Sequence, residues 1–374
     1  YKKCLIFIII AYLKELDVKI GLIIPANIKY APYVQYYLQY FDQNGITYEV
    51  ISWNKSGINE DVAYSYFFKV NDKNLIYRII GYIGYAAFVY KILKFRKYDG
   101  IIIFTIAPAI LMHKILVTKY SRKFIFDIRD DSKLRHIFSS VFKELIANAY
   151  VIVSSSPEYK KWIGRDVIIC HNVDIKSLHD NEYMDYFRIT KPYRIMFAGS
   201  FLLEWDTNLK MLRKIGNSKN IKFIFYGPES NEKKRLEKFV EKNMLTNTSF
   251  FGTYNKKDIY KFYREKADVV NIIRKRTIVN QNALPNKFYD AVVAGKPIVV
   301  FSHNTVIVNY VREFNLGFII TDDNFKTFEF QLIMNINNFD CSKYISGRHA
   351  FIKYIENDYR KFYDILSKWL NDIL

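Results

Sequence analysis

Short apolar runs alternate with helix-like stretches along almost the whole chain, and this alternation restricts the fold more than any other feature. Examples of the runs are VKIGLIIP at 18–25, YDGIIIFT at 98–105 and YRIMFA at 193–198. Runs dominated by apolar residues in this way are typical of strands buried on both faces of a parallel sheet. The sequence therefore predicts an α/β protein in which helices cover both faces of parallel sheets.

The alternation stops once, at residues 174–191, where the sequence is polar and rich in acids. It then resumes with new strand and helix pairs. We therefore expect two successive doubly wound halves, residues 1–187 and 188–352, followed by a terminal helix at 353–374. In such folds a ligand lies at the carboxyl ends of the strands, and here we also expect it in the crevice between the halves.

Two apolar segments bear on membrane contact. Residues 4–13 read CLIFIIIAYL, about ten apolar residues, whereas a spanning helix needs about 20. We interpret 1–16 as an upstream extension or a short lead that dips into a membrane. Residues 75–97 are mostly apolar, with five basic residues and no acidic ones. They fit either an interfacial helix on anionic lipid or a buried helix with a solvated basic end.

The chain is strongly basic, with 56 Lys and Arg against 37 Asp and Glu, a formal charge of +19. The abundance of Lys, Tyr and Phe is partly what an AT-rich genome encodes through codon bias. The remaining excess suits an anionic partner, such as a phosphorylated ligand, an acidic membrane or nucleic acid. No RNA-recognition, zinc-finger or helix-turn-helix pattern accompanies the charge, so we do not expect a nucleic-acid partner.

Cysteine and histidine give no sign of a metal site. The three cysteines stand far apart without a CxxC motif, which indicates a reducing compartment. His113, His136 and His171 lack metal-ligand spacing and are expected to be structural.

Beyond residues 4–13, no apolar run reaches the length of a membrane span without charged residues. We therefore expect the body of the protein to be soluble and cytoplasmic.

The segment LPNKFYDAVVAGKPIVV at 284–300 is the most informative for function. Pro285 stands at the start of its predicted helix. The free N–H groups of a helix N-terminus attract phosphate, and Lys287 adds a positive charge there. Asp290 lies one turn beyond Asn286, where a carboxylate can accept hydrogen bonds from two ribose hydroxyls. The pattern indicates a nucleoside-diphosphate site; a well-capped helix between two strands is the other interpretation.

This segment resembles the donor-binding part of GT-B glycosyltransferases of the family-4, or group 1, type, in the branch that builds bacterial surface polysaccharides. Further stretches resemble other motifs of that family in the expected order: FDIRD at 126–130, VIVSSSPE at 151–158, CHNVD at 170–174, MFAGSFLLEWDTNL at 196–209 and FIFYGP at 223–228. The resemblance implies the GT-B fold, in which two Rossmann-like domains face each other across a cleft. It makes 1–187 the acceptor domain, 188–352 the nucleotide-sugar domain and 353–374 a helix that packs back on the first domain.

The resemblance also assigns roles to residues of the donor segment. Asp290 falls on the acidic position that contacts the ribose. The backbone amides from Leu284 to Lys287 fall on the diphosphate. Asn282 replaces the other acidic residue of the family motif, which contacts the donor sugar, and so removes a charge there.

Two cationic positions of the family are absent. Ser200 and Trp205 stand where many relatives have Arg and Lys, so the phosphate charge must be neutralised elsewhere. Arg274, with Lys275 and Arg276, is our candidate; a solvated basic loop is the other interpretation. The expected donor-binding residues are Gly199, Ser200, Gly227, Arg274, Asn282, Leu284, Pro285, Asn286, Lys287 and Asp290.

Asp130, the last residue of FDIRD, is the catalytic candidate on the acceptor side. A carboxylate there can take the proton of the acceptor hydroxyl, and like-charged neighbours would raise its pKa. Structural ion pairing of Asp127, Asp130 and Asp131, which crowd one strand end beside Arg129, is the other interpretation. Retaining members of the resembled family need no clear protein nucleophile. We expect no metal and no other cofactor, because no Asp-x-Asp set is suitably placed.

We therefore expect a hexosyl-transferring glycosyltransferase. It would move a sugar from a UDP- or GDP-sugar to a hydroxyl of a growing, lipid-linked bacterial surface glycan such as a capsule or exopolysaccharide. The reaction is expected to be retaining and metal-independent, and the enzyme cytoplasmic and peripheral on the inner face of the cell membrane. Two alternatives are a catalytically inactive GT-B homologue that serves as a scaffold or partner subunit, and a nucleotide-sugar 2-epimerase.

Overall fold

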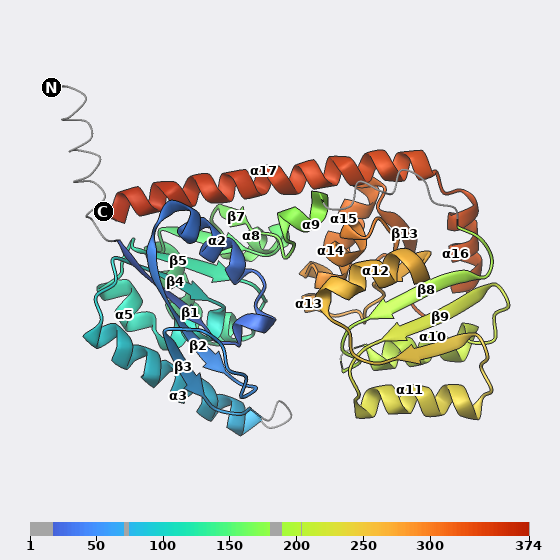
Figure 1. The fold of residues 1–374 in the computed structure, drawn as a ribbon, viewed down its shortest axis with the longest axis horizontal. Coiled ribbons are helices and arrows are strands. Elements are labelled where there is room, and N and C mark those ends of the chain that lie inside the picture. Colours follow the sequence, from blue (N-terminus) through green and yellow to red (C-terminus); the bar gives the residue numbers. More distant parts are fainter. Residues whose placement is uncertain (1–17, 71–74, 180–188, 203, 374) are drawn as a thin grey trace. The chain divides into compact units, whose positions relative to one another are not determined.

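The computed structural model describes residues 18–70, 75–179, 189–202 and 204–373 (Figure 1). The chain forms two compact units, the first made of residues 1–171 and 357–374 and the second of residues 172–356. The boundary expected after residue 187 falls in 180–188, outside the described residues, as does the lead at 1–16. The boundary expected after residue 352 lies inside one continuous helix, α17 (Cys341–Ile373).

The first unit is built on a seven-stranded parallel sheet with the order β3-β2-β1-β4-β5-β6-β7. Its strands are β1 (Lys19–Ile24), β2 (Thr47–Asn54), β3 (Tyr64–Phe67), β4 (Gly100–Phe104), β5 (Phe124–Ile128), β6 (Val151–Ser154) and β7 (Val167–Ile169). Strands β4, β5 and β6 are buried at every position, as their continuous apolar sequences predict.

Helices cover both faces of this sheet. On one face α2 (Val34–Asn44) and the last part of α17 pack together, with the ring of Tyr37 against those of Phe104 and Phe362. On the other face lie α3 (Leu75–Phe95), α4 (Ile106–Leu111), α5 (His113–Thr118) and α7 (Ser139–Asn148). The shorter helical segments are η1 (Ile28–Tyr30), α6 (Leu134–Ile137), η2 (Pro157–Tyr159) and α8 (Lys160–Ile163).

The second unit is built on a six-stranded parallel sheet with the order β10-β9-β8-β11-β12-β13. Its strands are β8 (Tyr193–Ala198), β9 (Ile221–Tyr226), β10 (Thr248–Phe251), β11 (Val269–Asn271), β12 (Ile298–Phe301) and β13 (Gly317–Ile320). Its helices are α9 (Ile175–His179), α10 (Trp205–Ile215), α11 (Asn231–Lys242), α12 (Lys256–Lys266), α13 (Ile278–Asn282), α14 (Asn286–Val293), α15 (Thr305–Phe314) and α16 (Phe328–Asn337). The expected α/β class and the two doubly wound halves are confirmed.

Helix α17 belongs to both units, and the expected terminal helix is only its last part. In the second unit Gly347 of α17 touches α15, since a Cβ at this position would lie 1.9 Å from the carbonyl oxygen of Phe314. In the first unit the fully buried Trp369 lies against Gly100 of β4, where a Cβ would come within 2.4 Å of the indole ring. At each end of α17, therefore, a glycine is needed because the helix and the neighbouring element pack too closely for a Cβ atom.

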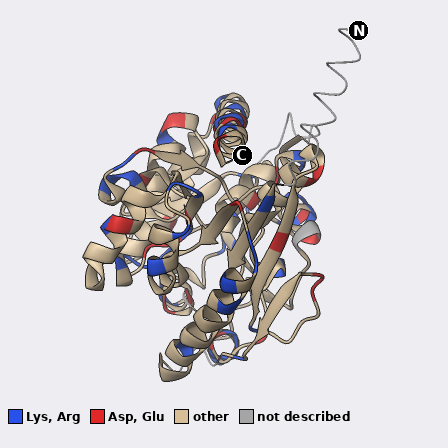
Figure 2. Ribbon diagram, turned by 90° about the vertical axis from the view of Figure 1, so that its left-hand side faces the viewer, with Lys and Arg blue, Asp and Glu red and all other residues tan. Residues whose placement is uncertain are grey.

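Helix α3 is buried only in part. Tyr85, Val89 and Leu93 are in the core, whereas Leu75 and Ile76 are 66% and 67% exposed. Among the described residues α3 is the one helix long and apolar enough to cross a membrane. The charged residues of the chain as a whole are scattered over many helices and loops rather than gathered into a single stripe (Figure 2).

Candidate active site

Helix α14 begins at the carboxyl edge of the second sheet with its first amides uncapped by a side chain. Its N-cap residue is Pro285, which has an extended backbone and makes no side-chain cap hydrogen bond. The first amides of any α-helix lack partners within the helix, and the helix dipole makes this end positive. The donor segment therefore places the N-terminus of a helix here, as the sequence predicts.

Lys287 of this first turn points into the protein rather than into solvent. Its side chain is 10% exposed, and its Nζ lies 4.1 Å from the centroid of the Phe197 ring in β8. The Glu204 Oε1 atom is 3.5 Å from Nζ, longer than a normal hydrogen bond. Burial lowers the pKa of Lys287, and the Glu204 carboxylate opposes that shift. The ammonium group is therefore held in an aromatic and weakly solvated position.

Arg274 meets the same carboxylate. Its Nε lies 3.4 Å from Glu204 Oε1, and both side chains are 10% exposed. Two cations, Lys287 and Arg274, thus share one carboxylate oxygen in a buried position. The cluster keeps a net positive charge at the carboxyl edge of the sheet, which is where a bound anion would be stabilised.

Hydrogen bonds hold the loop of Arg274 in position. The side chain of His303, after β12, donates from Nε2 to the carbonyl of Arg274 at 3.0 Å. Asn271 accepts from the backbone of Ile273 at 2.9 Å, and Asn280 donates to the carbonyl of Lys275 at 2.8 Å. Of the three basic residues expected here, Arg274 is buried whereas Lys275 and Arg276 are exposed.

Asp290 lies on the side of α14 that faces α12. Its carboxylate adds to the effect of burial in raising the pKa of Tyr254 to about 12, and it also raises the pKa of Tyr260 and Tyr263. The structure thus brings Lys287 to Arg274, whereas Asp290 lies among tyrosines of α12 and the loop before it.

The glycines and the small residues of the predicted site differ in their surroundings. Gly199 has a φ of 145°, and a Cβ there would meet only Phe197, at 3.9 Å. A Cβ on Gly227 would lie 2.3 Å from the carbonyl oxygen of Gly199, so this glycine is needed for packing. Ser200 accepts a hydrogen bond from the backbone of Leu202 at 3.3 Å.

The other predicted donor residues are spread around the start of α14. Leu284 is buried, 6% exposed, and packs into the unit. Asn286 is exposed, and Asn282 is half-buried at the end of α13. The sequence analysis did not include Glu204 among the site residues. The signal available in the sequence was an acidic residue close to the end of the predicted strand at 193–198.

In the first unit Asp130 is exposed just beyond the carboxyl end of β5. The neighbouring acids are in ion pairs: Asp127 accepts from Arg129 at 2.5 Å, and Asp131 accepts from Arg135 at 2.6 Å. Asp127 therefore pairs with Arg129, as the structural interpretation expects, whereas Asp131 pairs with Arg135 instead. Asp130 is the most exposed of the three carboxylates.

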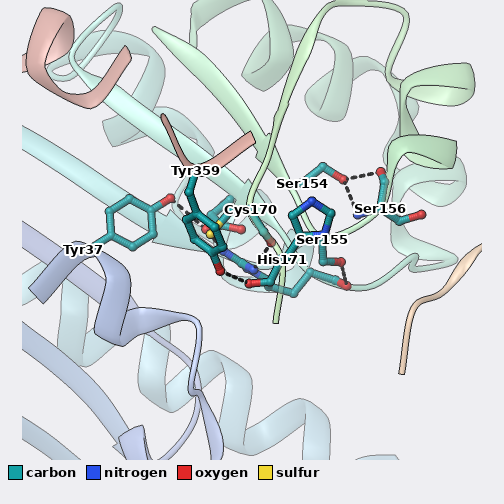
Figure 3. Close-up of polar contacts among 9 residues, drawn as sticks. Tyr37, Ser154, Ser155, Ser156, Cys170, His171 and Tyr359 are labelled. Atoms are coloured by element: carbon teal, nitrogen blue, oxygen red, sulfur yellow. Dashed lines mark hydrogen bonds and ion pairs between the residues drawn. The ribbon is translucent and has the colours of Figure 1, made fainter. Parts of the chain in front are cut away.

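His171 is a structural residue in the same unit (Figure 3). The ring is fully buried, and its Nε2 lies 3.1 Å from Asp358 of α17. Tyr359 donates its hydroxyl to the carbonyl of His171 at 2.6 Å. Burial lowers the pKa of His171, although Asp358 opposes the shift. This cluster fastens α17 to the edge of the first unit.

No three His, Cys, Asp or Glu side chains among the residues that the structure describes gather into a group that could hold a metal ion. The charge available for an anion in the second unit comes from Lys287, Arg274 and the amides of α14.

Comparisons with known proteins agree with this fold. Residues 187–354 match the family described as glycosyl transferases group 1. The matched residues cover most of the second unit, and the match agrees with the resemblance of the donor segment. No curated protein matches the sequence.

Solved structures share the fold of this chain at low sequence identity. HepE from Anabaena, in complex with UDP and glucose, has a TM-score of 0.63 and 12% identity, over 94% of this chain and all of that one. WaaG, a glycosyltransferase involved in lipopolysaccharide biosynthesis, has a TM-score of 0.57 and 12% identity, over 93% and 99% of the two chains. UDP-N-acetylglucosamine 2-epimerase from Rickettsia bellii has a TM-score of 0.63 and 13% identity, over 96% and 98%. These similarities establish the GT-B fold.

Proposed function

We propose that this protein is a glycosyltransferase that moves a hexosyl group from a UDP- or GDP-sugar to a hydroxyl of a growing, lipid-linked bacterial surface glycan. One observation supports the part of this proposal that concerns donor binding. A buried Lys287 and a buried Arg274 converge beside the uncapped N-terminus of α14. Two fixed cations and a helix N-terminus together suit a diphosphate better than a single phosphate or a carboxylate.

The same groups suit a reaction without a metal or another cofactor. When the glycosidic bond to the nucleotide breaks, negative charge builds up on the diphosphate that leaves. Lys287, Arg274 and the α14 amides are already oriented toward an anion, so they stabilise that charge without reorganisation. In a retaining transfer of this kind the leaving diphosphate can take the proton of the acceptor hydroxyl.

Other residues serve the two substrates. Asp290 accepts hydrogen bonds from the vicinal ribose hydroxyls, and Asn282 contacts the hydroxyls of the donor sugar. On the first unit the exposed carboxylate of Asp130 accepts a hydrogen bond from the acceptor hydroxyl. Asp130 is more exposed than Asp127 and Asp131, which supports it over them for this role.

Helix α3 supports a lipid-linked acceptor on an anionic membrane. Its first turns are exposed and apolar, with Ile80 50% and Ile83 56% exposed. Every charged residue from 75 to 97 is Lys or Arg. Apolar side chains enter the region between headgroups and acyl chains, while the basic ones pair with lipid phosphates. We propose that the enzyme is peripheral on the cytoplasmic face of the cell membrane through this helix.

A donor screen tests the proposed function. The protein is incubated with radiolabelled UDP- and GDP-sugars, with and without a polyprenyl-diphosphate-linked glycan. We expect slow release of the nucleotide without the acceptor and labelled glycan with it, and NMR of the product reports retention. A nucleotide sugar altered only at C2 would instead indicate the 2-epimerase, and no nucleotide binding would indicate an inactive scaffold.

A further inference from the structure

The carboxylate of Glu204 stands between the two cations of the donor site. Its Oε1 is 3.5 Å from Lys287 Nζ and 3.4 Å from Arg274 Nε, and Glu204 is 8% exposed. We propose that Glu204 is an internal counter-ion that takes the position of a diphosphate oxygen while the donor is absent and yields it when the donor binds. This inference rests on the proposed function.

The geometry of this cluster differs from that of the structural ion pairs in the same chain. Arg194 and Asp268 form a two-point pair, with Nη2–Oδ1 at 2.7 Å and Nε–Oδ2 at 3.1 Å. At Glu204 a single oxygen faces two cations at distances longer than hydrogen bonds. Lys287 Nζ has no hydrogen bond of normal length among the described residues. The Lys287 ammonium group therefore has unused donor capacity in a side chain that is only 10% exposed, where unmet donors are costly.

The charge balance points the same way. Glu204 offers one negative charge to the two cations Lys287 and Arg274, whereas the diphosphate of a nucleotide sugar offers two. A carboxylate that stayed in place would repel the incoming anion, so it must turn aside. Glu204 is the N-cap residue of α10 but makes no side-chain cap hydrogen bond, so turning the carboxylate costs the helix no contact.

The proposal makes Glu204 a residue that lowers the affinity for the donor and sharpens its selectivity. A ligand must outcompete the carboxylate for both cations, which a diphosphate does and a monophosphate does poorly. Free Lys287 and Arg274 would otherwise attract any small anion in the cytoplasm. The exchange of one anion for another also avoids leaving two like charges alone in the protein.

Calorimetric titration with UDP, GDP and UMP tests this role. Three variants are compared with the wild type: Glu204→Gln removes the charge, Glu204→Asp shortens its reach, and Glu241→Gln removes an exposed carboxylate from α11 of the same unit. We expect Glu204→Gln to bind the diphosphate about 5- to 10-fold more tightly, Glu204→Asp to be intermediate and Glu241→Gln to match the wild type. The preference for UDP over UMP should fall in Glu204→Gln.

Each other outcome is informative. Unchanged or weaker diphosphate binding in both Glu204 variants, with circular dichroism showing that they are folded, would mean that Glu204 only supports the two cations. If Glu204→Gln does not fold, the Glu204→Asp titration decides alone. Absence of UDP and GDP binding in the wild type would overturn the proposed function itself, and with it the inference. Steady-state kinetics provide an independent check, since KM for the donor should fall more than kcat in Glu204→Gln.

Discussion

The protonation of Lys287 controls how the donor site responds to pH. Burial lowers the pKa of this ammonium group, while the Glu204 carboxylate opposes the shift and the Arg274 guanidinium adds to it. The charged form binds the diphosphate, so affinity should be full at low pH and should fall as the pH rises through the lowered pKa. Lys287→Arg keeps its charge throughout, because a guanidinium does not deprotonate in this range.

The expected result is a UDP dissociation constant that rises with pH in the wild type, starting below the pH at which an ordinary lysine loses its proton. In Lys287→Arg the constant should stay nearly flat over the same range. A wild-type affinity that does not change with pH would show that Lys287 does not pair with the diphosphate.

A variant of Asp130 tests acceptor chemistry separately from donor binding. If its carboxylate contacts the acceptor hydroxyl, Asp130→Asn should lower the transfer rate about 100-fold or more and leave UDP binding unchanged. The matched control is Asp131→Asn, since Asp131 is paired with Arg135 and should affect stability only. The rates and the titrations are measured on the same samples. Normal transfer by Asp130→Asn would remove this residue from the mechanism.

At the residue scale, the sequence indicates the helix N-terminus and two cations for the donor site. It does not indicate that both cations meet the same carboxylate. Lys287 and Arg274 were inferred separately, one from the donor segment and one from a basic loop. The carboxylate that joins them, Glu204, lies far away in the sequence. Only the parallel sheet, which brings the ends of β8 and β11 together, puts these three residues in contact. A pattern of local spacing does not contain that information.

At the scale of elements, strands with continuous apolar sequences were predicted within a residue or two, as β8 and β9 show. Strand β3 was missed because YSYF alternates in burial at the edge of the sheet. Residues 106–118 form two helices, α4 and α5, that meet at Met112, where the local sequence shows no break. Edge position and tertiary packing decide such cases, and neither leaves a strong local signal.

Helix α3 provides the test of membrane contact. The wild type should sediment with vesicles that contain phosphatidylglycerol and should be released by high salt, which screens the basic residues. Replacing Ile80 and Ile83 by Glu should weaken binding at least about 10-fold, because each exposed isoleucine loses its burial in lipid. The control replaces two exposed apolar residues of the second unit, Met244 and Ile278, by Glu. Equal binding by both double variants would exclude α3 as the contact.

At the scale of the whole molecule, α17 is the element that both units share. Trp369, near its end, is fully buried against Gly100. Trp369→Ala should destabilise the protein by about 3–5 kcal/mol, because it removes a large core side chain. The neighbouring exposed Lys368 supplies the control, Lys368→Ala. Urea denaturation followed by circular dichroism measures both, and equal stabilities would show that this end of α17 does not anchor the first unit.

The central claim is that a nucleotide's diphosphate binds Lys287 and Arg274 at the N-terminus of α14. It is tested most directly by titrating the double variant Arg274→Ala/Lys287→Ala with UDP and GDP, beside Lys275→Ala/Arg276→Ala, which loses the same charge from exposed neighbours. We predict a loss of about 100-fold or more in the first variant, since each charged contact is worth about 1.5–3 kcal/mol, and a change below about threefold in the second. Equal losses in the two variants, or none in the first, would contradict the claim.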